Sequence, residues 1–231
     1  MIEPREPNPF VLDLKGRTPP LRWEEVFPVP VRSVEVELGS GKGMFLRRES
    51  AGRPDVGFLG VERAGKFFEL CARRIERDGR ANVRLTRADA FDLLARWLPA
   101  AGIAVLHVYF PDPWPKKRHA KRRMLTPPLF DLAARTIESG GCLSIATDVT
   151  PYFGEATATL DAHPCFARME LPEGAIASVA TNYALKYARE GRALHLARYR
   201  RTPESAPPAP NPLRLRFLAD RSPSPASADG P

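Results

Sequence analysis

The chain has 231 residues, with 35 Lys or Arg against 27 Asp or Glu, so its formal net charge is +8. This length suits one domain with extensions and allows a sizeable core, while the cationic excess favours nucleic acid or an anionic membrane as partner. No apolar run approaches the roughly 18 residues of a membrane-spanning helix and no signal peptide is visible, so we expect a cytoplasmic protein without membrane spans.

The two ends of the chain differ in composition from its middle. Residues 1–32 are rich in proline and charge, which predicts a partly ordered N-terminal arm. Trp23 and Phe27 are spaced to share one face of a short helical turn that docks on the domain, the alternative being an arm that is only solvated. Residues 202–231 are rich in Pro, Ala and Ser and are predicted to be a disordered tail, apart from a segment at 213–218 able to pack or bind.

Short apolar runs alternate with segments of helical periodicity between these ends, over residues 33–201. Strands are predicted at 34–38, 56–61, 82–86, 103–110, 142–146, 166–171 and 193–199. Helices are predicted at 44–51, 64–78, 90–98, 129–138 and 153–163. This alternation predicts a doubly wound α/β domain with a mostly parallel sheet and right-handed crossovers.

The cysteines give no sign of a metal site or of disulfides. Cys71, Cys142 and Cys165 are odd in number and have no metal-ligand spacing. Three buried thiols in a reducing cytosol, with no bound metal, are therefore expected.

The first strand is followed by a glycine-rich turn at residues 37–43. Gly39, Gly41 and Gly43 permit positive φ and close approach of a ligand to the backbone. A phosphate-binding Walker A loop is excluded because Lys42 is not followed by Ser or Thr, and the third glycine comes one residue early for a dinucleotide motif. The alternative is a purely structural tight turn.

Acidic residues follow each of the first four predicted strands, and ligands of open α/β sheets bind at the carboxyl ends of strands. Glu37 lies at the first strand end, and Glu62 at the second could accept both hydroxyls of a ribose. Asp89, after the third, could meet an adenine amino group or simply cap a helix. With Asp112 after the fourth, these acids favour an adenosine that carries a cation over a pyrophosphate, which they would repel, and S-adenosylmethionine fits.

The fourth strand runs into the sequence FPDPWPKKRHAKRR at residues 110–123. Its three prolines cannot continue a strand, so they hold Asp112 on a stiff loop. Six cations follow within residues 116–123. An acid held beside a cationic run indicates chemistry on an anionic polymer, although such a run can also be only a solvated face.

Six segments resemble, in order and at matching spacing, the bacterial tRNA (guanine-N7-)-methyltransferases: residues 37–43, 60–62, 89–90, 110–123, 147–148 and 181–186. The resemblance covers about residues 30–200, and the PDPWPKKRH run within it is highly specific. It implies a class I methyltransferase fold, a Rossmann-like seven-stranded sheet whose last strand is antiparallel. It also implies transfer of a methyl group from S-adenosylmethionine to N7 of a guanosine in the variable loop of tRNA.

The resemblance assigns roles to individual residues. It implies that the glycine turn, Glu37, Glu62, Asp89 and Asp112 bind the methyl donor, with Asp112 also catalytic. It implies that the tRNA or its target guanine is bound by Lys116, Asp148, Thr181, Asn182, Tyr183 and Ala184. Trp114 or Tyr183 is suited to stack on the base, and Trp114 is equally suited to be a structural wedge.

One position departs from the family, which usually has Glu where this chain has Ala184. Either Glu190 substitutes for the missing carboxylate or guanine binding is weaker.

Two rival functions follow from these features. A NAD-dependent oxidoreductase explains Glu62 and the glycines but not the shortened turn or the basic loop, and a catalytically impaired tRNA-binding homologue is favoured only by Ala184. No obligate protein partner is apparent.

Overall fold

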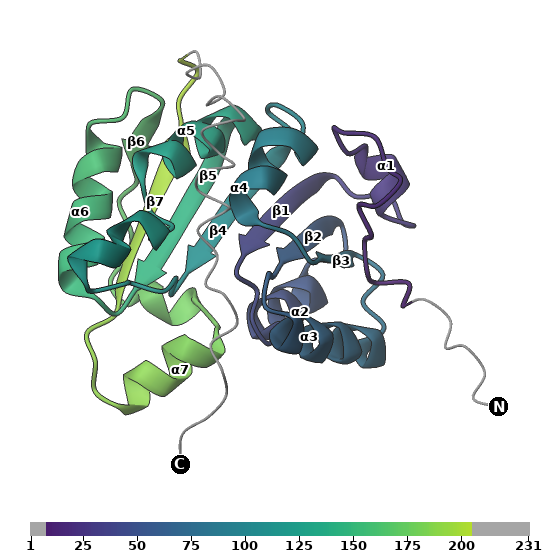
Figure 1. The fold of residues 1–231 in the computed structure, drawn as a ribbon, viewed down its shortest axis with the longest axis horizontal. Coiled ribbons are helices and arrows are strands. Elements are labelled where there is room, and N and C mark those ends of the chain that lie inside the picture. Colours follow the sequence, from purple (N-terminus) through teal and green to yellow (C-terminus); the bar gives the residue numbers. More distant parts are fainter. Residues whose placement is uncertain (1–7, 205–231) are drawn as a thin grey trace.

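The computed structural model describes residues 8–204, which form one sheet with helices on both faces (Figure 1). The sheet has seven strands in the order β3-β2-β1-β4-β5-β7-β6. Strands β1 to β5 are parallel to one another, and β7 is antiparallel to both β5 and β6. The strands are β1 Ser33–Leu38, β2 Val56–Val61, β3 Val83–Thr86, β4 Ile103–Tyr109, β5 Ile137–Thr147, β6 Phe166–Arg168 and β7 His195–Arg201. The predicted mostly parallel α/β sheet with an antiparallel last strand is confirmed.

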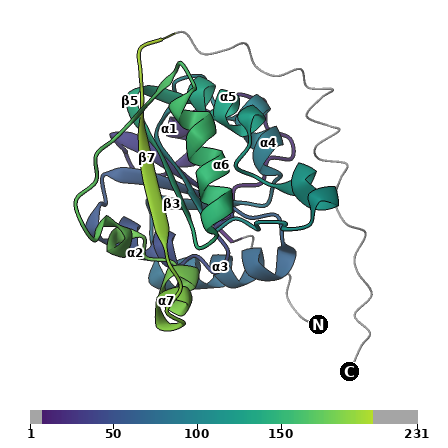
Figure 2. The ribbon, with the colours of Figure 1, turned by 90° about the vertical axis from the view of Figure 1, so that its left-hand side faces the viewer.

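The helices lie on both faces of this sheet (Figure 2). They are α1 Trp23–Val26, α2 Met44–Gly52, α3 Gly65–Asp78, α4 Ala90–Asp92, α5 Pro127–Thr136, α6 Thr150–Asp161 and α7 Asn182–Arg189. A π-helical turn, Leu93–Trp97, continues α4, and 3-10 turns occupy Lys117–Arg122 and Ala175–Ser178.

Each face of the sheet has its own core. Side chains of α1, α4, α5 and α6 pack with one set of strand residues, and side chains of α2 and α3 pack with the other. Because side chains alternate along a strand, Val34, Val36 and Leu38 of β1 enter the first core. Glu35 and Glu37 consequently lie on the face covered by α2 and α3.

The described part of the N-terminal arm packs against the domain. The Nε1 of Trp23 donates a hydrogen bond to the Gly102 carbonyl at 2.7 Å, and Phe27 is buried. A Cβ at Gly57 would lie 2.8 Å from the Phe27 ring, so this close contact needs glycine in β2. The expected docking turn is therefore present as α1, and an arm that is only solvated is wrong for residues 8–32.

Several predicted boundaries differ from the structure. The helix predicted to reach residue 138 ends at Thr136, because β5 already begins at Ile137, which pairs with Ile103. Helix α7 was not predicted, and Ala184 is its one buried residue. The tail predicted at 202–231, including segment 213–218, lies outside the described residues apart from its first three. The division into arm, domain and tail stays a prediction.

All three cysteines lie within the described part of the chain. Cys71 and Cys165 are buried and Cys142 is partly buried, all as free thiols. Within residues 8–204 no group of acidic, His or Cys side chains is arranged to hold a metal ion. Over the same residues, none of the helices combines the length and apolarity needed to cross a membrane.

Candidate functional site

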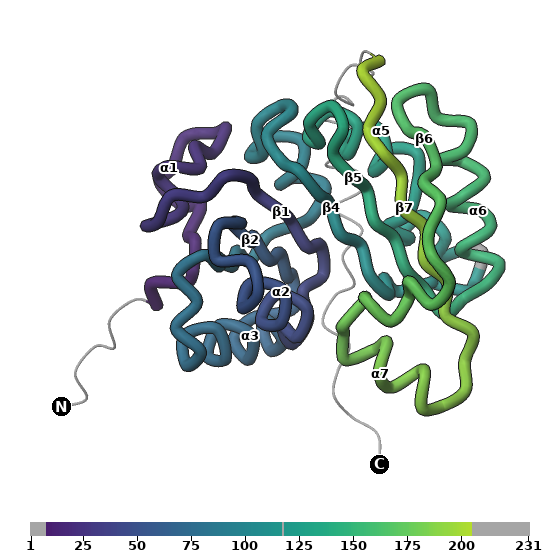
Figure 3. Tube along the Cα trace, turned by 180° about the vertical axis from the view of Figure 1, so that it is seen from behind, coloured from purple at the N-terminus to yellow at the C-terminus, as the bar shows by residue number. Residues whose placement is uncertain are grey.

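A cavity of about 320 Å³ lies at the carboxyl ends of β1, β2 and β4. Its lining brings together residues predicted from distant parts of the chain: Gly39, Gly41, Glu62, Asp89, Asp112 and Tyr183. The cavity is therefore in the place that the sheet topology predicts for a ligand. Figure 3 shows α7, which carries Tyr183, at the same end of the molecule as α2 and α3.

Glu62 holds the glycine turn as well as lining the cavity. One carboxylate oxygen accepts a hydrogen bond from the Gly41 backbone N–H at 2.9 Å, and the other accepts from Ala64 at 2.7 Å. Each oxygen of a carboxylate has more than one acceptor position, so both can also accept from ligand hydroxyls. The turn is thus fixed in a conformation in which Gly41 has φ of 53°.

Gly43 does not line the cavity. It lies at the start of α2 with φ of 74°, and a Cβ there would lie 2.3 Å from the Cys71 Sγ of α3. The sequence could not reveal this contact, because Cys71 is on a different helix. A glycine is needed here for packing between two helices, and its predicted role in cofactor binding stays a prediction.

Glu37 is buried beneath this turn and does not line the cavity. Its Oε2 has no hydrogen-bond partner within the described chain. Burial, and then repulsion from Glu62, raise the pKa of Glu37 well above its ordinary value. A buried carboxyl oxygen without a partner is rare and costly, which is the pattern expected where a ligand supplies the missing donor.

Asp89 caps a helix and also lines the cavity, while its predicted contact with an adenine amino group stays a prediction. Its Oδ1 accepts from the backbone N–H groups of Phe91 at 2.9 Å and Asp92 at 3.1 Å, so it caps helix α4. It also lines the cavity, and its second oxygen takes part in neither of these bonds. Capping therefore orients the carboxylate without using all of its acceptor capacity.

The loop that carries Asp112 is strained at both ends. Phe110 has φ of 51° and Trp114 has φ of 42°, left-handed values that bulky residues rarely adopt. Such residues cost on the order of 1–3 kcal/mol each and cluster at functional sites. Asp112 lies between them, exposed, at the edge of the cavity.

The cationic run divides into residues that fix this loop and residues that remain exposed. The Nε of Arg123 donates to the Pro113 carbonyl at 3.0 Å, and its Nη1 pairs with Glu155 at 2.5 Å. The Arg122 guanidinium lies 4.9 Å from the centre of the Trp114 ring. Both arginines and Lys121 line the cavity, whereas Lys116 is exposed outside the lining.

Helix α7 supplies the wall opposite the glycine turn. Thr181 caps it by accepting from the Ala184 N–H at 2.9 Å. Tyr183 is 44% exposed and lines the cavity. Its ring centre lies 5.8 Å from that of Tyr187, which lies 5.8 Å from that of Phe110. A row of aromatic rings thus connects α7 to the Asp112 loop.

An ion-pair cluster holds the other end of α7. Arg192 pairs with Asp148, which follows β5, at 2.8 Å and with Glu190 at 2.8 Å, and its Cζ lies 4.3 Å from the centre of the Tyr187 ring. Neither acid lines the cavity, and Ala184 does not line it either, so the substitution of Glu190 for the absent carboxylate stays a prediction. Sequence reasoning missed Tyr187 and Arg192; the i, i+4 spacing of Tyr183 and Tyr187 would have revealed the first had a helix been predicted.

Comparison with known proteins agrees with this geometry. A family model described as a putative methyltransferase matches residues 31–197. The chain is similar to the tRNA (guanine-N(7)-)-methyltransferases of Nitrosococcus oceani (30% identical, covering 81% of this chain and 79% of that protein) and Paramagnetospirillum magneticum (39%, covering 76% and 75%). The fold resembles the 16S rRNA methyltransferase KamB, with a TM-score of 0.58 at 14% identity over 78% of this chain and 93% of that one. The chain belongs to the tRNA (guanine-N7-)-methyltransferase family.

Proposed function

We propose that this protein transfers a methyl group from S-adenosylmethionine to N7 of a guanosine in the variable loop of tRNA. The observation that carries the proposal is the placement of Asp112. It lies on a strained loop at a cavity shared with Glu62 and Asp89, and cations of the 116–123 run line the same cavity. The relatives from Nitrosococcus oceani and Paramagnetospirillum magneticum, matched over 79% and 75% of their length, are named tRNA (guanine-N(7)-)-methyltransferases. We also propose that it works in the cytoplasm.

The residues present fit S-adenosylmethionine. Glu62 would accept the ribose hydroxyls while it holds the turn, and Asp89 would accept from the adenine amino group through the oxygen that does not cap α4. The unpartnered Oε2 of Glu37 fits a donor or cationic group of the ligand. A pyrophosphate does not fit, because three carboxylates near one turn would repel it.

S-adenosylmethionine supplies an electrophilic methyl carbon, to which the N7 lone pair forms a bond as the carbon–sulfur bond breaks, leaving a thioether and a positively charged purine. N7 carries no proton, so no base has to act before attack and positioning dominates the rate. Asp112 would stabilise the positive purine and accept hydrogen bonds from guanine N–H groups. No metal ion is needed for any of these roles.

The acceptor base has to reach this cavity from outside. In A-form RNA the major-groove edge that carries N7 is too deep and narrow for side chains, so the target guanosine must lie in a loop or be turned out. Tyr183, exposed at the cavity, is suited to stack on such a base. Exposed Lys116 and Lys121 are suited to neighbouring phosphates.

The test is transfer of labelled methyl from S-adenosylmethionine to unmodified tRNA, with digestion and identification of N7-methylguanosine as product. Wild-type protein is expected to produce it. A tRNA whose variable-loop guanosine is replaced by adenosine is expected to receive no label. Cofactor binding without transfer to any tRNA would contradict the proposal and favour an impaired tRNA-binding homologue, whereas binding of NAD in place of S-adenosylmethionine would favour the oxidoreductase.

A further inference from the structure

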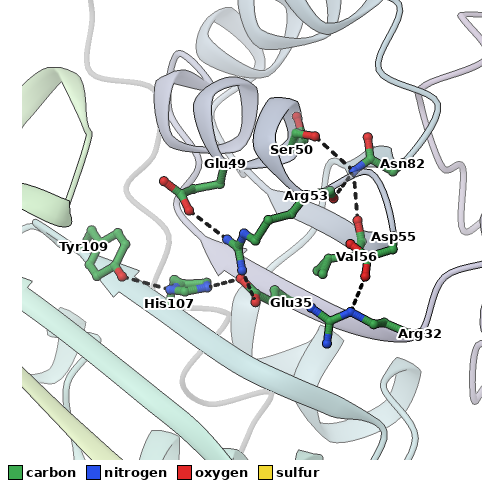
Figure 4. A network of polar contacts seen from close by, with 10 residues as sticks. All are labelled: Arg32, Glu35, Glu49, Ser50, Arg53, Asp55, Val56, Asn82, His107 and Tyr109. Atoms are coloured by element: carbon green, nitrogen blue, oxygen red, sulfur yellow. Dashed lines mark hydrogen bonds and ion pairs between the residues drawn. The ribbon is translucent and has the colours of Figure 1, made fainter.

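A chain of buried polar side chains runs across the sheet from β1 to β5, and Figure 4 shows three of its members, Glu35, His107 and Tyr109. Glu35 of β1, His107 and Tyr109 of β4 and Ser144 of β5 are between 1% and 7% exposed. The His107 Nε2 lies 3.0 Å from the Glu35 Oε2, and its Nδ1 lies 2.9 Å from the Tyr109 hydroxyl. That hydroxyl lies 3.0 Å from the Ser144 Oγ.

Ion pairs extend the chain of hydrogen bonds at its Glu35 end. The other oxygen of Glu35 accepts from the Arg53 Nη1 at 2.6 Å, and Arg53 also pairs with Glu49 at 2.8 Å. The His107 Nε2 faces the Glu35 carboxylate, which can only accept, so Nε2 carries a proton and donates it. In the neutral imidazole the other nitrogen, Nδ1, then accepts a hydrogen bond from the Tyr109 hydroxyl. Burial raises the pKa of Tyr109, so its hydroxyl keeps the proton that it donates.

Stability alone does not account for these residues. A buried polar network can often be replaced by apolar side chains of similar volume without loss of stability. The matching strand positions on the opposite face, Leu106 and Val108, are apolar and fully buried. What a satisfied network adds is a single fixed arrangement of the side chains that it connects.

The network ends at the cavity. Tyr109 lines the cavity and is the last residue of β4, directly before the strained Phe110 and the loop with Asp112. Phe45 of α2 packs on it from below, with ring centres 4.6 Å from His107 and 5.2 Å from Tyr109. The position of the tyrosine is thus set by contacts with residues of three elements, α2, β4 and β5.

We propose that Glu35 and His107 are positioning residues for methyl transfer, because through the Tyr109 hydroxyl they fix one wall of the methyl-donor cavity and the base of the Asp112 loop. The inference rests on the proposed function for the identity of the donor. It concerns donor binding, which is measured without tRNA. Nothing in the segments that resemble the family indicates this network, since Glu35 and His107 lie outside them.

The first experiment compares Tyr109→Phe with Tyr199→Phe, by calorimetric titration with S-adenosylmethionine and by thermal unfolding. Tyr199 is a matched control: it is fully buried, its hydroxyl donates to Asp161 at 2.7 Å, and it does not line the cavity. Each variant removes a hydroxyl that has two hydrogen-bond partners, so both are expected to lose similar stability. Only Tyr109→Phe is expected to raise the Kd for S-adenosylmethionine, by about fivefold, with the KM for tRNA little changed.

A second pair of variants separates the two bonds of His107. His107→Asn keeps a group near Nδ1 that can accept from Tyr109, and His107→Gln keeps a group near Nε2 that can donate to Glu35. The Asn variant is expected to bind S-adenosylmethionine more tightly than the Gln variant. An unchanged Kd in Tyr109→Phe, with the same loss of melting temperature as Tyr199→Phe, would reduce the network to a structural role. Tight cofactor binding without methylation of tRNA would contradict the proposed function and leave this inference standing.

Discussion

The two walls of the cavity are held together by different kinds of contact. The donor wall lies on the β1–β3 side, where Glu62 and Asp89 each bind two backbone N–H groups and Glu37 is buried beneath them. The acceptor wall lies on the other side, where Asp112 and Tyr183 are exposed and ring contacts and arginines hold the segments that carry them. A small ligand that fits one conformation favours the first kind of wall, whereas a large RNA that brings its own shape favours the second.

The largest effect is expected from Asp112→Asn on the acceptor wall. Loss of the charge that stabilises the positive purine should lower kcat for tRNA methylation by about a hundredfold, the usual cost of losing one electrostatic contact in a transition state. Because the asparagine keeps the loop shape, the melting temperature should stay within a degree or two of wild type. Single-turnover assays with saturating tRNA measure the change. Asp55→Asn, in an exposed pair with Arg32, is the control, and full activity in Asp112→Asn would remove the proposed role.

Glu62→Gln tests the donor wall. The amide cannot accept at both of its ends, so the turn at Gly41 or the bond to Ala64 loses an acceptor, and the ribose loses a charged one. The Kd for S-adenosylmethionine should rise by about tenfold or more, as expected for a hydrogen bond to a charged group. The Kd for tRNA, measured by filter binding, should not change. Equal losses for both ligands would mean that the two walls are not independent.

The double variant Lys116→Gln, Lys121→Gln tests whether the exposed cations bind phosphates. Each lost contact should lower the slope of log Kd against log salt by about 0.7 to 0.9, so the two together lower it by roughly 1.4 to 1.8. Binding of S-adenosylmethionine should be unaffected. Lys15→Gln with Arg17→Gln, in the exposed part of the arm, changes the net charge equally and is the control. Equal slopes for the two variants would make the run only a solvated face.

The difference between the contacts that hold the two walls also explains which residues could be predicted from the sequence. The acids of the donor wall were predictable, since the carboxyl ends of parallel strands meet at one edge, Glu62 directly follows β2 and Asp89 lies three residues after the end of β3. The contacts that hold the acceptor wall in place could not be predicted from the sequence. Arg192 and Asp148 are paired across 44 residues, and only Ala184 of α7 is buried. Contacts that depend on tertiary structure, such as Gly43 against Cys71, leave no local pattern in the chain.

The smallest expected effect is on the stability of the protein and concerns Glu37, the buried acid of the donor wall. Glu37 has a pKa raised above the ordinary 4.5 by burial and by Glu62, so in the folded state it holds its proton more tightly than in the unfolded chain. The proton on Glu37 therefore contributes to the free energy of unfolding. That contribution is fully present below about pH 4.5 and is lost as the pH rises through the folded-state pKa.

Glu37→Gln cannot ionise, so it should be more stable than wild type by on the order of 1 kcal/mol near pH 8, and the gain should vanish near pH 4.5. Urea unfolding at the two pH values measures it, with the exposed Glu173→Gln as the control that should show no such dependence. The same variant should bind S-adenosylmethionine more weakly, because it loses a carboxylate beneath the cavity. A variant that is less stable at both pH values would show that Glu37 is satisfied in the folded protein. If Glu37→Gln is instead more stable than wild type but binds S-adenosylmethionine more weakly, the donor wall retains a destabilising acid because its ligand requires it.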